Sequence, residues 1–247
     1  MTDILRSEWT KIRSVPSTVW TLAVTALLMI GLGALISVAS KATADGRPIP
    51  GDQAVMASLT GIMFASLAIA TLGVLVISSE YRTGGIRTSL MAVPRRMSLL
   101  GGKVVVFTVT ALVVCTVASA AAVAVGLAIT RPASVDMGAA ARSVLGAGLY
   151  LTACGLFGLG LGTLVRHTPG ALVSAIALML VLPQLAGALP GRWGKAVSDH
   201  FTTNAGLEVV RDQPGNPLGP WSGLGVYFLW VAVAVVAGAV LMQRRDA

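Results

Sequence analysis

Few residues in this sequence have the types and spacing needed for catalysis. The run Gly101-Gly102-Lys103 comes nearest to a phosphate-binding loop, in which backbone N–H groups and a lysine cradle the phosphates. Met97 stands where that motif needs its first glycine, and Val104 stands where serine or threonine would hold magnesium. The run also leads into an apolar stretch instead of following a strand. We therefore predict no nucleotide site in this chain.

Histidine and cysteine offer no catalytic or metal site either. His167 and His200 both lie outside the apolar stretches, so a serine–histidine dyad within a membrane would lack its base. Cys115 and Cys154 are too few for a disulfide framework or a zinc site. We predict that the chain is not an enzyme and has no catalytic, cofactor or metal site of its own.

One long basic loop, residues 79–103, has the features of a partner-binding segment. After a glycine pair, Ile86, Leu90 and Val93 recur at i, i+4 and i+7, which predicts a short helix with one apolar stripe, ended by Pro94. Such a helix, flanked by basic residues, is a shape that a soluble partner can grip. The alternative is a basic loop that only fixes the orientation of the chain in a membrane.

Composition places the elements around this loop in a lipid bilayer. Of the 247 residues, 55% are apolar and 11% are charged, whereas a soluble domain has about 25% charged residues. A span needs roughly 20 apolar residues, and without a closed barrel only helices satisfy their own backbone groups. We predict an all-α membrane protein, a single membrane domain over residues 1–247, with six spans near 18–38, 54–78, 104–128, 143–165, 170–189 and 222–242.

The fifth span is the least regular of the six. Pro183 interrupts it, and a proline removes a helical hydrogen bond and usually kinks the helix. A re-entrant element or a pair of short helices is an alternative to a full crossing there. After it, Val197, Phe201, Ala205 and Val209 repeat every four residues, which predicts an amphipathic helix on the outer leaflet or against the bundle.

The distribution of basic residues predicts the orientation. With six spans both termini lie on one side, and that side carries eleven Lys and Arg residues against seven on the other. Because basic loops stay in the cytoplasm, we expect both termini there, in the plasma or inner membrane. The basic residues flank spans, which indicates contact with membrane lipid and no nucleic-acid partner.

The first residues predict a helix at the membrane surface. Leu5, Trp9 and Ile12 recur at i, i+4 and i+7 with basic residues between them, which is typical of a short amphipathic helix lying among the headgroups. The apolar run 18–38 is longer than the 7–15 residues of a signal-peptide core, so we interpret it as a span.

Two segments resemble one family of membrane proteins. The loop sequence ISSEYRTGGIRTSLMAVPRR resembles the first cytoplasmic loop of ABC-2 type permeases, the membrane subunits of ATP-binding-cassette exporters. Gly85 departs from that pattern, since threonine is usual there. The start SEWTKIRSVPSTVW resembles the entry helix of the same family. The loop residues that match the family or lie on the apolar stripe are Glu80, Tyr81, Arg82, Gly84, Arg87, Leu90, Pro94, Arg95 and Arg96.

The resemblance implies how such a chain would work. Its partners would be a second permease copy, identical or different, and a pair of ATP-binding subunits that hold ATP and magnesium. Residues 80–94 would form a cytoplasmic coupling helix seated on the ATPase, with Glu80 and Arg82 making charge-assisted hydrogen bonds. No charged residue lies in mid-span, where ion-coupling residues are usually found, so a carrier driven by protons or sodium is disfavoured.

Two alternatives from other classes remain at this stage. They are a membrane-embedded scaffold without transport activity, and a carrier or channel that acts alone. Among polar residues inside the spans, Gln184 is the best candidate for the substrate pathway, because it is the only carboxamide there and adjoins Pro183. The predicted spans are mainly Ala, Val and Gly without charge, and a pathway lined by such residues favours an apolar or amphipathic cargo. The GxxxG spacing at Gly158–Gly162 predicts a close helix contact, within one protomer or between two.

Overall fold

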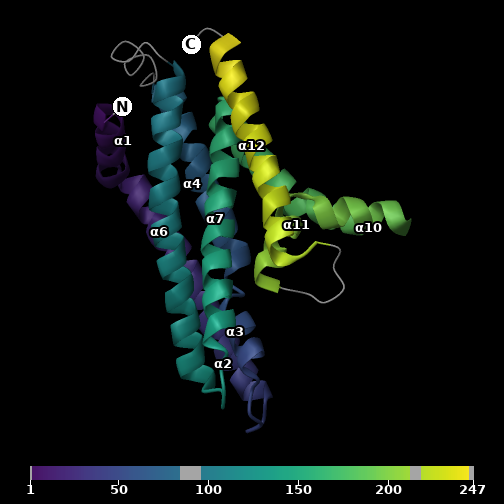
Figure 1. Ribbon diagram of the computed structural model, residues 1–247. Helices are drawn as coiled ribbons and strands as arrows, with labels where there is room; N and C mark the ends of the chain where they lie inside the picture. The colour runs from purple at the N-terminus through teal and green to yellow at the C-terminus, as the bar shows by residue number, and fades with distance from the viewer. Residues whose placement is uncertain (1, 84–95, 212–217, 245–247) are drawn as a thin grey trace.

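The computed structural model describes residues 2–83, 96–211 and 218–244, and within these ranges the chain is helical with no strand. Long helices run side by side along one bundle, and shorter ones lie at its ends and flank (Figure 1). In chain order the helices are α1 (Thr2–Ser14), α2 (Pro16–Thr43), α3 (Gly51–Ser58), α4 (Ile62–Thr83), α6 (Arg96–Thr130), α7 (Met137–Val165), α8 (Thr168–Ile176), the π-helix η1 (Ala177–Val181), α9 (Leu182–Gly187), α10 (Gly191–His200), α11 (Thr202–Arg211) and α12 (Pro220–Arg244).

Six stretches of the described chain are long and apolar enough to cross a bilayer, as the sequence predicts. They are α2, α3 with α4, α6, α7, the run α8–η1–α9, and α12. Five of the six predicted windows lie inside these stretches, and the fifth window extends two residues past the end of α9. A turn at 59–61 divides the second stretch, a break that its uniform hydropathy does not reveal.

Helix α7 forms the centre of the bundle. In its most apolar window 83% of the residues are buried, against 22% for α2, and it packs on α4, α6 and α12. Glycine makes this possible: a Cβ on Gly158 would lie 2.1 Å from the carbonyl oxygen of Ala70 on α4. A Cβ on Gly160 would lie 2.9 Å from the Cβ of Ala234 on α12. The contact predicted from the GxxxG spacing is therefore made within one protomer.

The two ends of α7 are fixed by local chemistry. At the start, the Asp136 carboxylate accepts hydrogen bonds from the backbone N–H groups of Gly138 and Ala139, at 2.8 and 3.1 Å, and so caps the helix. At the end, Arg166 takes a left-handed conformation with φ of 57°, and its N–H donates to the Gly162 carbonyl. The chain then turns directly into α8.

The fifth crossing is continuous but distorted, and Pro183 explains the distortion. Proline has no N–H, so the carbonyl of Met179, four residues earlier, loses its helical donor. The segment widens into η1, and the hydroxyls of Thr202 and Thr203 on α11 donate to Leu178 and Met179 at 2.7 and 2.8 Å. The crossing therefore keeps its hydrogen bonds by recruiting α11.

The predicted amphipathic helix after the fifth span is two helices, α10 and α11, broken at Phe201. The Trp230 indole donates to the His200 carbonyl at 3.1 Å, and the Phe201 and Trp230 rings are 5.4 Å apart. Trp230 lies ten residues into α12, about 15 Å along its axis. The α10–α11 turn is thus level with the middle of a span, and α10 projects sideways from the bundle (Figure 1).

Both described ends of the chain lie at one end of the bundle. The start of α1 and the end of α12 are at the top in Figure 1, together with the start of α6. The end of α4 joins them there, since the side chains of Glu80 on α4 and Lys103 on α6 are in contact. We call this the termini end of the bundle. This arrangement agrees with an even number of crossings.

Candidate coupling site and membrane cavity

Four charged side chains meet at the termini end and form what we call the charge cluster: Glu8, Lys11, Glu80 and Lys103. Lys103 Nζ lies 2.7 Å from Glu8 Oε2 and 2.9 Å from Glu80 Oε1. Lys11 Nζ lies 2.6 Å from Glu8 Oε1 and 3.0 Å from Glu80 Oε1. Each lysine therefore bridges both carboxylates, and the cluster is neutral overall.

Burial makes the charge cluster energetically significant. The side chains of Lys103 and Glu8 are each 3% exposed, and that of Glu80 is 15% exposed. Burial by itself raises the pKa of Glu8, but the charge of Lys103 and hydrogen bonds from both lysines outweigh it, so the pKa lies below its ordinary value. Burial lowers the pKa of Lys11, but the hydrogen bonds that Lys11 donates to Glu8 and Glu80 raise this pKa above its ordinary value. Both groups stay charged at neutral pH.

The charge cluster ties three helices together at one point. Glu8 and Lys11 come from α1, Glu80 from the last turn of α4, and Lys103 from the second turn of α6. A side chain at Gly102 would collide with Ile4, because α1 lies directly on the start of α6. The predicted coupling segment runs from the end of α4 to the start of α6, so the cluster joins both of its ends to the N-terminal helix.

A second set of contacts ties the end of α4 to the rest of the bundle. The Arg166 guanidinium lies over the Tyr81 ring at 5.1 Å, and it donates to the Leu241 carbonyl on α12 at 3.2 Å. The hydroxyl of Thr168 at the start of α8 donates to Ser78 on α4 at 3.0 Å. The last two turns of α4 are therefore held from both sides of the bundle.

Several residues expected to contact an ATPase lie outside the described ranges. Gly84, Arg87, Leu90, Pro94 and Arg95 belong to this group, together with the predicted coupling helix itself. Of the remaining predicted residues, Glu80, Tyr81 and Arg82 are in α4, and Arg96 is the first residue of α6. Of the predicted residues whose side chains the structure describes, Glu80 belongs to the charge cluster.

The N-terminal residues lie on α1 as expected, but a different face meets the bundle. Glu8 is buried, whereas Trp9 is 46% exposed and both Leu5 and Ile12 are half-buried. In the sequence, Lys103 belongs to a Gly-Gly-Lys run that lacks the other residues of a phosphate-binding loop, and Glu8 has no role beyond the family pattern. The available signal was charge at the ends of apolar stretches, with Glu80 following one and Lys103 preceding the next. Lys103 pairs with Glu8 across 95 residues of sequence and with Glu80 across 23, so neither pair has a local pattern.

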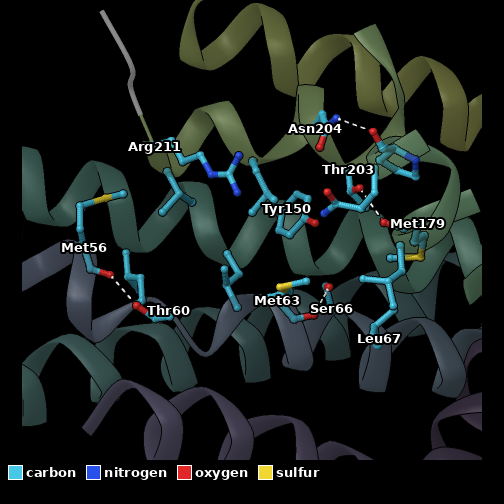
Figure 2. A pocket seen from close by; sticks show the side chains of 17 residues that line it. Met56, Thr60, Met63, Ser66, Leu67, Tyr150, Met179, Thr203, Asn204 and Arg211 are labelled. Carbon is cyan, nitrogen blue, oxygen red and sulfur yellow. Dashed lines mark hydrogen bonds between the residues drawn. The ribbon is translucent and has the colours of Figure 1, made fainter. Parts of the chain in front are cut away.

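A cavity of about 270 Å³ opens in the half of the bundle away from the termini. Its walls come from α3, α4, α7, the η1–α9 segment and α11 (Figure 2). Gln184, the predicted pathway residue, is among the lining residues. The full set is Met56, Leu59, Thr60, Ile62, Met63, Ser66, Leu67, Tyr150, Met179, Leu180, Pro183, Gln184, Thr203, Asn204, Leu207, Val210 and Arg211.

Most polar groups of the cavity are already occupied. The hydroxyls of Thr60 and Ser66 donate to backbone carbonyls on their own helical segments, and Thr203 donates to Met179. The Asn204 amide donates to Ser198. The other two polar lining residues with long side chains, Gln184 and Arg211, are both exposed. In Figure 2, Arg211 lies near Met56 and Thr60, with Asn204, Thr203 and Met179 at the opposite side of the cavity.

Six apolar crossings, one of which is the buried central helix α7, define a multi-pass membrane protein. The model of the family described as ABC-2 family transporter protein matches residues 4–187, about three quarters of the chain. The chain belongs to this family and is a transporter permease. No individual curated protein matches it.

Proposed function

We propose that this chain is the membrane subunit of an ATP-driven exporter. A separate subunit would bind and hydrolyse ATP with magnesium, and it would dock on the cytoplasmic segment 80–94. A second permease copy, identical or different, would complete the path across the cell membrane. The family membership supports a permease that works with an ATP-binding subunit, and the charge cluster supports the place of coupling.

The charge cluster is the observation that carries this proposal. The segment proposed to dock on the ATPase is joined at one end to α4 and at the other to α6. Glu80 is the first residue of this segment, and two lysines hold it to α1 and α6. A force applied to the segment would therefore move three helices together. Ion pairs that are largely buried have defined geometry, which suits the transmission of displacement.

The contacts of Tyr81 and Ser78 connect the end of α4 to the remaining helices of the bundle. Through Arg166 and Thr168 the end of α4 is linked to α7, α8 and α12. We infer that α4 transmits displacement from the docking segment to the cavity, since the first half of α4 lines that cavity. Displacement at Glu80 would then change the width of the cavity near Met63 and Leu67.

The orientation follows from charge and arrangement together. Both described chain ends lie at the termini end, and the basic excess of the sequence lies on the same side. We infer that this end faces the cytoplasm. Leu5, Trp9 and Ile12 would then contact the headgroups of the inner leaflet, because they lie on a face of α1 next to the one buried against the bundle.

The experiment combines co-purification with a measurement of ATP-dependent changes in the accessibility of the cavity rim. The tagged chain is purified in mild detergent, and an ATP-binding subunit is expected to co-purify. A single cysteine introduced as Thr60→Cys at the cavity rim should then change its alkylation rate when ATP and vanadate are added. Cys115 and Cys154 are fully buried, so they should leave this signal clean.

Glu80→Ala tests the coupling role. Glu8 still bridges Lys11 and Lys103 in this variant, so α1 and α6 remain joined while α4 loses its ion pairs. ATP hydrolysis and co-purification should persist, but the ATP-dependent change at Thr60→Cys should disappear; Arg82→Ala should act in the same direction. Asp3→Ala removes an exposed acid from the start of α1, at the same end of the bundle, and is the control. An unaltered response in Glu80→Ala would refute the coupling role, and failure of any ATPase to co-purify would favour a lone carrier or a scaffold.

A further inference from the structure

The membrane cavity has a polarity that specifies a class of ligand. Its described lining contains one cationic side chain, Arg211, and no aspartate or glutamate. Arg211 is exposed, so its guanidinium is accessible, and its five N–H donors suit carboxylate, sulfate or phosphate groups. The remaining wall is mainly Met, Leu, Ile and Val. Charge and apolar surface therefore occur together in one cavity.

The two kinds of surface are separated along the depth of the membrane. α11 runs antiparallel to the first half of α12: His200 contacts Trp230, a Cβ on Gly206 would meet Tyr227, and Val209 lies beside Trp221. Arg211, two residues after Val209, is therefore level with the start of α12 at the membrane surface. Leu67, Ser66 and Met179 line the cavity closer to the middle of the bundle.

This gradient matches an amphipathic molecule in a lipid monolayer. A ligand with its head at Arg211 and its chain along Met63, Leu67 and Met179 would have its head at the surface and its chain toward the midplane. Three methionines, Met56, Met63 and Met179, line this path, and methionine adapts to chains of different shape. A volume of about 270 Å³ lies below the range of roughly 300–1,000 Å³ that encloses drug-sized ligands, so a whole two-chain lipid would not fit.

We propose that this cavity binds a single-chain amphipathic anion, with its head group on Arg211 and its apolar chain along α4 and η1. If the chain exports what it binds here, this ligand is the cargo class, and that extension rests on the proposed function. Binding itself is tested on the permease alone, without ATP or an ATPase.

The test measures protection of a thiol at the cavity rim. The Thr60→Cys chain is placed in nanodiscs of phosphatidylcholine, and the rate of maleimide alkylation is measured with added dodecanoate below its micelle concentration. Thr60 is exposed on the cavity wall, and its hydroxyl makes only a 3.3 Å bond to Met56. Ser134→Cys, exposed on the loop before α7 and outside the cavity, reports any general effect of dodecanoate on the bilayer.

Two further probes and three variants distinguish recognition of the anionic head group from binding of the apolar chain alone. Dodecanol and dodecyltrimethylammonium have the same chain with a neutral or cationic head, and both should protect Thr60→Cys less than dodecanoate. Arg211→Gln should raise the dodecanoate concentration for half-protection about ten- to hundredfold, the size expected for one charge-assisted contact. Arg211→Lys should retain part of the affinity. Arg131→Gln removes an exposed arginine outside the cavity and should change nothing.

Each contrary outcome would overturn the proposal. Equal protection by all three probes, or no effect of Arg211→Gln, would show that the cavity does not recognise an anionic head. Equal protection of Ser134→Cys would show an effect of the bilayer and not of a site. Protection by phosphatidylglycerol in the nanodisc, with none added by dodecanoate, would identify a two-chain lipid as the occupant. None of these results bears on coupling at Glu80, so failure here and failure of the proposed function are distinguishable.

Discussion

Replacing Lys103 by methionine removes the most deeply buried cation of the charge cluster. Lys103 is 3% exposed and contacts both carboxylates, at 2.7 and 2.9 Å. Methionine has similar length and helix propensity, so the change removes charge with little loss of packing. Glu8 and Glu80 are then left with Lys11, whose side chain is 40% exposed. The cluster changes from neutral to a net charge of minus one inside the protein.

The expected cost is set by burial. Removing one partner of a buried ion pair costs about 3–5 kcal/mol, because the other charge stays buried without compensation. The contacts of Lys11 are partly exposed to solvent and offset at most about 1 kcal/mol of this. The double variant Glu8→Met with Lys103→Met leaves one neutral pair, Lys11 with Glu80. We expect it to be about 2 kcal/mol more stable than Lys103→Met alone, although it carries more changes.

The pH dependence of the free energy of unfolding should have opposite signs in the native chain and in Lys103→Met. In the native chain the lowered pKa of Glu8 adds stability above its ordinary value of 4.5, which is lost as the pH falls through the lower folded value. Without Lys103, we expect burial, the largest single influence on Glu8, to outweigh Lys11 and to raise the pKa of Glu8 above its ordinary value. Lys103→Met should therefore lose stability as the pH rises from about 4.5 toward 7, a range in which the native chain retains its full contribution.

The assay follows unfolding in detergent by the alkylation of Cys115 and Cys154, both fully buried in the folded chain. Lys41→Met is the control, since Lys41 is exposed and donates only to the Ile129 carbonyl; we expect it to cost about 1 kcal/mol or less. A cysteine at Ile4, against Gly102, reports separately on release of α1. Equal stability of Lys103→Met and Lys41→Met, with no release of α1, would refute the energetic role of the cluster.

Two further predictions concern packing and orientation. Gly158→Ala should lower the free energy of unfolding by about 1–3 kcal/mol, since its Cβ would overlap the Ala70 carbonyl; Gly31→Ala, with nothing within 4 Å, should be neutral or stabilising when compared by the same unfolding assay. A reporter enzyme fused after Ala247, and one inserted at Arg95, should both be active only in the cytoplasm; an external signal from either would reverse the orientation and remove the basis for docking an ATPase there.

Local composition was sufficient to predict the number and type of the long elements. Whether a segment crosses the bilayer depends on its own length and hydropathy, so the apolar windows predict the six helices without knowledge of their neighbours. Pro183 predicts an irregular fifth span for the same reason, because the loss of its N–H is a local property. The fine break at 59–61 was missed, since it falls within uniformly apolar sequence.

Contacts between helices could not be predicted in this way. In lipid an apolar face has no preferred partner, so the arrangement depends on close fit, as at Gly158, and on a few polar contacts. The sequence shows that Pro183 frees the Met179 carbonyl. It does not show that the hydroxyls of Thr202 and Thr203 donate to the carbonyls of Leu178 and Met179.

The sequence by itself determined that this protein crosses a membrane six times, with a basic loop between the second and third crossings, because those features depend on neighbouring residues and on the thickness of the bilayer. Only the tertiary structure brought Glu8, Glu80 and Lys103 to one point and closed a cavity beside Arg211. A charge pair between residues 95 positions apart has no local signature, since it forms only after the helices that carry it have packed.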